Sequence, residues 1–81
     1  MGVNGAYRTS DLYVVAWLLT KGLELQDIDR RNPRRSDFIF SDREDRPKLV
    51  HSFICGRAEG NLPDFIFYLR KAKRLLYSHE V

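Results

Sequence analysis

Cysteine, proline and long hydrophobic runs are scarce in this sequence. A single cysteine, Cys55, excludes an intramolecular disulfide and is typical of a protein kept in a reducing compartment. The longest apolar run, residues 12–19, is much shorter than the roughly 20 residues that a membrane-spanning helix needs. The N-terminus lacks the positive region and the cleavage site of a signal peptide. We therefore expect a cytoplasmic protein with no membrane partner.

An excess of charge of one sign is also lacking. The 14 basic and 11 acidic residues give a net charge of +3, which permits a polyanionic partner without requiring one. Aromatic residues, in contrast, make up 12% of the 81 residues, and their large rings can fill the core of one small domain. We predict a flexible N-terminal lead over residues 1–8, a single domain over residues 9–78 and a short tail over residues 79–81.

The first predicted element is a helix over residues 11–21. The hydroxyl side chains of Thr9 and Ser10 are suited to cap its N-terminus, and Gly22 is suited to end it. Its middle is apolar on every face, and such a helix is normally buried on every side. Because one short chain offers little to cover it, we expect a homodimer in which Tyr13 and Trp17 lie at the protein interface.

The rest of the chain is predicted to form a hairpin and two more helices. Strands at residues 23–26 and 38–40 flank a polar turn at residues 30–35. The two helices that follow are capped by Asp45 and Asn61, each with a proline two residues later. The order α-β-β-α-α predicts an α+β fold in which a two-stranded antiparallel hairpin packs on three helices.

The register of the hairpin follows from its apolar residues. Side chains alternate between the two faces of a strand, so Leu23 and Leu25 share one face, as do Phe38 and Phe40. If these four residues form the core face, strict alternation places Ile28 on the outer face. We therefore expect the outer face to be partly covered as well.

Four arginines crowd the predicted hairpin turn. Guanidinium groups bind phosphate through paired N–H donors, and a projecting two-stranded ribbon can enter a nucleic-acid groove. A second basic set lies on the last helix. The predicted nucleic-acid contacts are Arg30, Arg31, Arg34 and Arg35, with Lys71 and Arg74 as secondary contacts. The alternative interpretation is a solvated turn whose arginines pair with Asp27, Asp29 and Asp37.

Two further clusters are weak candidates for chemistry. His51 and Cys55 have the spacing of two metal ligands on a helix, but a structural zinc site needs four, and no oxyanion loop accompanies the thiol. The acidic residues Asp42, Glu44 and Asp45 lie where a helix begins, a position that favours acids for structural reasons. We predict no catalytic residue, no metal site and no cofactor, and thus a protein that is not an enzyme.

Several short motifs resemble a family of short bacterial and phage-associated domains without an assigned function. The motifs are Tyr7-Arg8-Thr9-Ser10-Asp11-Leu12-Tyr13, Lys21-Gly22, Phe38-Ile39-Phe40 and Leu75-Leu76-Tyr77. The resemblance spans about Tyr7 to Tyr77, and its motifs are caps and core positions, so it implies a fold and no catalytic residues. The leading prediction is a non-enzymatic domain that binds nucleic acid weakly through phosphates. The alternative is a homodimeric protein-interaction or regulatory adaptor module with no nucleic-acid role.

Overall fold

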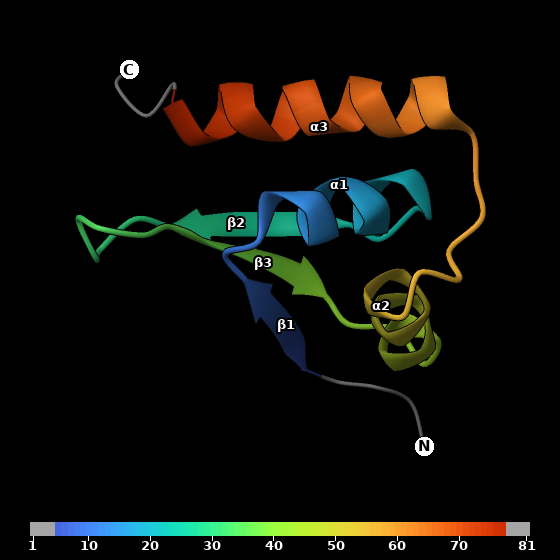
Figure 1. Cartoon of the computed structure of the whole chain (residues 1–81). Helices are drawn as coiled ribbons and strands as arrows, with labels where there is room; N and C mark the ends of the chain where they lie inside the picture. The colour runs from blue at the N-terminus through green and yellow to red at the C-terminus, as the bar shows by residue number, and fades with distance from the viewer. Residues whose placement is uncertain (1–4, 78–81) are drawn as a thin grey trace.

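The computed structural model describes residues 5–77 and combines a three-stranded antiparallel sheet with three helices (Figure 1). The order in the sheet is β1-β3-β2. Both outer strands run antiparallel to β3, so β1 and β2 are parallel to each other and α1 is the crossover between them. In chain order the elements are β1 (Ala6–Thr9), α1 (Leu12–Thr20), β2 (Leu25–Asp29), β3 (Asp37–Ser41), α2 (Arg46–Ile54) and α3 (Leu62–Tyr77).

The predicted α+β class, the hairpin and the three helices are confirmed, whereas the two-stranded sheet was wrong. The third strand, β1, begins within the segment predicted to be a flexible lead and ends one residue beyond it, and its Tyr7 pairs with Phe40 of β3. This pairing places β3 in the centre of the sheet and gives it hydrogen-bonding partners on both sides. Residues 1–4 of the predicted lead and the predicted tail at residues 79–81 lie outside the described residues.

A β-bulge changes the predicted faces of β2. Leu25 pairs with Phe40, Asp27 with Ile39 and Ile28 with Phe38, so Gln26 is the extra residue. A bulge shifts the alternation of side chains by one residue. Ile28 therefore lies on the core face beside Phe38, and the prediction that it lies on the outer face was wrong.

Helix α1 is the centre of the hydrophobic core. It lies between α3 and the sheet, and α2 packs against it as well (Figure 1). Residues 14–18 are all buried. The indole Nε1 of Trp17 donates a hydrogen bond of 2.9 Å to the carbonyl oxygen of Leu49, and the Trp17 ring stacks on Phe53 at 5.7 Å. Contacts within the chain thus account for a helix that is apolar on every face.

The ends of α1 are fixed by two residues. The carboxylate of Asp11 caps its N-terminus by accepting hydrogen bonds from the backbone N–H groups of Tyr13 and Val14. The prediction of Thr9 and Ser10 as caps was therefore off by one or two positions. Gly22 follows the helix with φ of +87°, a conformation that favours glycine. None of the helices within residues 5–77 has the length and apolar character required to span a membrane.

Candidate functional site

Two of the four arginines in the hairpin turn form ion pairs on the sheet face that points away from α1, which we call the outer face. Arg31 holds both carboxylate oxygens of Asp29, at 2.9 and 2.7 Å. The Nε of Arg35 lies 3.2 Å from Asp37. Asp29 and Asp37 are directly opposite each other on neighbouring strands, and Arg8 lies within reach of both, at 2.5 and 3.4 Å. These arginines offset the repulsion between two facing carboxylates.

This network keeps Asp29 ionised. Hydrogen bonds from the side chain and backbone of Arg31, together with one from Arg8, hold the pKa of Asp29 well below its ordinary value. The same contacts raise the pKa of both guanidinium groups. Arg31 and Arg35 thus have the carboxylate partners Asp29 and Asp37 that the alternative interpretation of the turn predicted, whereas Asp27 forms no ion pair among the described residues.

The other two arginines have no carboxylate partner among residues 5–77. The Nη2 of Arg30 donates a hydrogen bond to the carbonyl oxygen of Leu75, near the C-terminus of α3. This contact connects the hairpin turn to α3, where a positive charge is favoured by the helix dipole. The backbone N–H of Arg34 donates to the side chain of Asn32 at 2.9 Å, which shapes the turn. Its guanidinium forms no ion pair within the described part of the chain.

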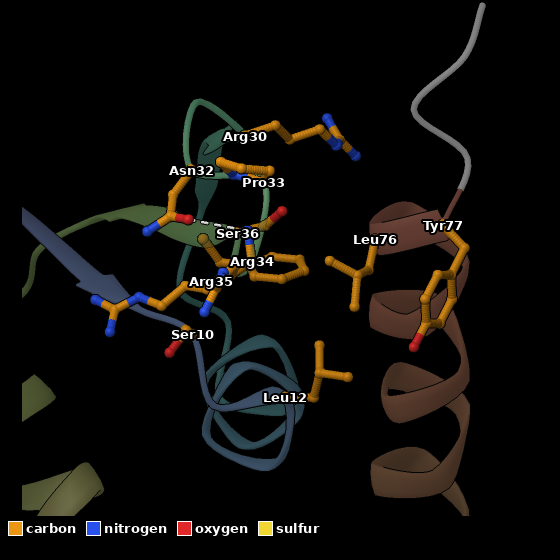
Figure 2. Close-up of a pocket in the computed structure, with 11 residues that line it drawn as sticks. Ser10, Leu12, Arg30, Asn32, Pro33, Arg34, Arg35, Ser36, Leu76 and Tyr77 are labelled. Atoms are coloured by element: carbon orange, nitrogen blue, oxygen red, sulfur yellow. Dashed lines mark hydrogen bonds between the residues drawn. The ribbon is translucent and has the colours of Figure 1, made fainter.

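These two arginines lie at the rim of a groove between the hairpin turn, the start of α1 and the end of α3 (Figure 2). Arg35 also lines this groove, although its guanidinium is paired with Asp37. The groove has a volume of about 660 Å³. Leu12, Phe38 and Leu76 provide apolar lining, and Tyr77 closes the side formed by α3. The Tyr77 side chain is 72% exposed. The groove therefore combines cationic groups at its rim with apolar and aromatic surface inside it.

The predicted secondary contacts do not line this groove. Arg74 lies instead at a second, shallower hollow of about 440 Å³ on the outward side of α3, together with Arg70, Phe67, Ile66 and Pro63. We call it the α3 hollow. Lys71 is exposed on the same helix and lines neither site. Tyr77 and Phe67 were not predicted from the sequence as site residues. Their signal was the presence of aromatic residues close to basic ones at helical spacing.

The two weaker clusters are held in local contacts. The Sγ of Cys55 lies 3.5 Å from Nε2 of His51, and both residues are exposed. No group of three or more residues suited to hold a metal ion occurs within residues 5–77.

The acidic cluster at the start of α2 is occupied by arginines. Arg46 binds both carboxylate oxygens of Asp42, at 2.9 and 3.1 Å, and Arg43 binds both oxygens of Asp45, at 2.6 and 3.0 Å. Hydrogen bonds from these arginines lower the pKa of both carboxyl groups. Glu44 is exposed. Each aspartate thus already has a bidentate cationic partner.

The two residues predicted at a protein interface have different environments. Tyr13 is 56% exposed and is available at the surface. Trp17 is only 5% exposed, because α2 and α3 cover it. The described contacts of Trp17 lie within the chain, and its place at an interface with a partner stays a prediction. The homodimer itself stays a prediction.

Comparison with known proteins gives a family without an activity. Residues 4–78 match the model of a family described as "Domain of unknown function (DUF5659)", so the chain belongs to this family. No curated protein and no solved structure matches the chain significantly. The match spans nearly the same residues as the resemblance drawn from the sequence motifs. The bacterial and phage origin of that resemblance stays a prediction.

Proposed function

We propose that this DUF5659 domain binds nucleic acid, with the guanidinium groups of Arg30 and Arg34 contacting phosphates at the rim of the groove. One observation carries the proposal. The ion pairs divide the four arginines of the turn into two classes, because Arg31 and Arg35 face carboxylates while Arg30 and Arg34 do not. The proposal assigns binding and no catalytic step.

The chemistry of the two rim arginines suits phosphate. A guanidinium carries five N–H donors in a planar fork, and the hydrogen bond from Arg30 to the Leu75 carbonyl uses only one of them. Arg34 has all of its side-chain donors available among the described contacts. Arg31 binds both carboxylate oxygens of Asp29, so a phosphate would have to displace that carboxylate to bind it in the same way. Arg35 makes one hydrogen bond to Asp37, whose negative charge offsets its own. We therefore narrow the predicted contacts to Arg30 and Arg34.

A pair of matched double variants tests this assignment. Arg30→Ala/Arg34→Ala and Arg31→Ala/Arg35→Ala each remove two positive charges from the same turn. We expect the first variant to lose most of the affinity for a fluorescent oligonucleotide, measured by anisotropy, and the second to lose much less. The dependence of log affinity on log salt should also become shallower by about one unit for each phosphate-binding arginine removed.

The controls distinguish binding at the groove from a general effect of the net positive charge. Equal loss of affinity in the two double variants would show that only the total charge matters and would overturn the assignment. Binding that does not change across a salt series would overturn phosphate contact altogether. Circular dichroism and thermal unfolding of both variants should confirm that the fold is retained, since all four substitutions are at exposed positions.

A further inference from the structure

The α3 hollow repeats the chemistry of the groove. Each contains one exposed aromatic ring and two arginines that have no carboxylate partner among residues 5–77. In the groove these are Tyr77 with Arg30 and Arg34. In the α3 hollow they are Phe67 with Arg70 and Arg74. Such a recurrence, in two neighbouring hollows, indicates one extended ligand.

Helical spacing connects the two hollows. Phe67, Arg70, Arg74 and Tyr77 follow each other at intervals of three or four residues, so they lie along one side of α3. The two rings are about 15 Å apart along the helix axis. Tyr77 lines the groove and also belongs to this side of the helix, so it is the point at which the two sites meet.

The aromatic rings on this side are unusually accessible. Phe67 is 58% exposed and Tyr77 is 72% exposed, whereas the rings of Phe38 and Phe40 are completely buried. The only acidic residue of α3 is Asp64, in its first turn. The side between the two rings therefore presents aromatic and cationic groups without an acidic one.

We infer that the ligand is single-stranded nucleic acid, which runs from the groove across Tyr77 and along α3 to Phe67. The inference rests on the proposed function and adds the class of nucleic acid. Unpaired bases have free faces that stack on aromatic side chains, and arginines between the stacking positions contact the phosphates that connect the bases. A duplex keeps its base faces covered, so the two rings and the apolar lining of the groove would gain nothing from it.

Three fluorescent ligands of equal length, measured by anisotropy on the full chain, test the inference. They are an oligothymidine of about 12 nucleotides, which is within the usual site size of small single-strand-binding domains, the same length of abasic strand, and a duplex. The abasic strand keeps the phosphates and removes the bases. We expect the oligothymidine to bind about tenfold more tightly than either of the other two.

A variant without the two exposed rings provides a second test of base stacking. Phe67→Leu/Tyr77→Leu keeps apolar side chains with good helix propensity at both positions, so the fold is retained. We expect it to bind oligothymidine about tenfold more weakly and to bind the abasic strand unchanged. Tyr77→Phe, which keeps an aromatic ring, should bind like the original chain.

The outcomes distinguish the inference from the proposed function. Equal, salt-dependent binding of all three ligands that requires Arg30 and Arg34 would overturn the single-strand inference and leave the proposed function in place. Preference for the duplex, or weaker binding of the abasic strand by the double leucine variant, would also overturn it. The absence of binding to any of the three ligands would overturn both proposals.

Discussion

The guanidinium of Arg31 holds both carboxylate oxygens of Asp29, through Nε at 2.9 Å and Nη2 at 2.7 Å. The same carboxylate also accepts a hydrogen bond from Arg8 of the opposite edge strand. Asp29 thus connects two strands that are not neighbours in the sheet and occupies two arginines at once. This carboxylate controls how much positive charge the hairpin turn presents.

Removal of this carboxylate should strengthen nucleic-acid binding. Asp29→Asn removes the carboxylate partner of Arg31, which then becomes available for phosphate, whereas Arg8 keeps its ion pair with Asp37. We expect affinity for an oligonucleotide at moderate salt to rise about fivefold, equivalent to one additional phosphate contact, as measured by anisotropy. Asp27→Asn is the matched control, because the Asp27 carboxylate has the same charge but, among residues 5–77, accepts a hydrogen bond only from the adjacent backbone N–H of Ile28. An equal gain in both variants would contradict the prediction.

The same ion pair should make stability depend on pH in the acidic range. The folded-state pKa of Asp29 lies below its ordinary value of 3.8, because hydrogen bonds from Arg31 and Arg8 favour the charged form. A depressed folded-state pKa contributes stability that is fully present above about 3.8 and is lost as the pH falls toward the folded-state value. We expect the difference in urea midpoint between the original chain and Asp29→Asn to be constant near neutral pH and to shrink between about pH 4 and pH 2.

A difference that persists unchanged at the acidic end would show that Asp29 is not the titrating group. The prediction concerns the direction and the pH window, because Asp29 lies at the surface, where solvent screens ion pairs.

A third prediction concerns the turn that ends α1. Gly22 has φ of +87°, and a Cβ atom there would lie 3.7 Å from Arg43, an ordinary contact. The cost of Gly22→Ala is therefore one of backbone conformation, and we expect a loss of about 1 kcal/mol in the free energy of unfolding. Gly22→Asn should lose less, since asparagine tolerates this conformation better. Gly5→Ala should have almost no effect, because nothing lies within 4 Å of a Cβ there.

Local sequence patterns predicted the three helices but not the complete sheet. Caps, glycines and apolar periodicity lie within a few residues of the elements they define, so all three helices were found. β1 has only four residues, and its stability comes from pairing with β3 more than thirty residues away, as in the pair of Arg8 with Ile39. A short strand of this kind has too little alternation to be recognised before its partner is known.

The bulge in β2 also made one core residue unpredictable from the local sequence. Strict alternation placed Ile28 outside, and one extra residue at Gln26 reversed that assignment. A bulge of this type depends on how the two strands fit together, and nothing in the residues from Leu25 to Asp29 identifies it. The position of Ile28 therefore followed from pairing and not from its own sequence.

The candidate site was found only in part, for the same physical reason. The four arginines could be located from the sequence, but which of them have carboxylate partners could not be predicted. That distinction depends on the cross-strand register and on a contact between residues 30 and 75. Asp29 faces Asp37 across the sheet, so the ion pairs of Arg31 and Arg35 lie on the outer face, whereas Arg30 reaches Leu75 on α3. The groove and the ion pairs are both formed by residues that lie far apart in the sequence and are brought together by the fold.

The last prediction tests whether Trp17 serves the interior of the chain or an interface between two copies. Its indole donates to the Leu49 carbonyl at 2.9 Å and stacks on Phe53. Trp17→Phe removes this hydrogen bond and leaves a partly buried carbonyl without that donor, and it also reduces the volume of the core. We expect the free energy of unfolding to fall by about 1–3 kcal/mol in urea titrations.

The control is Tyr13→Phe, which alters an exposed hydroxyl on the same helix and should change the free energy of unfolding by less than about 0.5 kcal/mol. Analytical ultracentrifugation of the same variants separates the two roles. A residue whose contacts lie within the chain should leave the sedimentation coefficient of the folded protein unchanged when it is replaced. If Trp17→Phe instead shifted the protein to a smaller species at unchanged monomer stability, Trp17 would contribute to a subunit interface, and the packing described for α1 would have to be shared with a second copy.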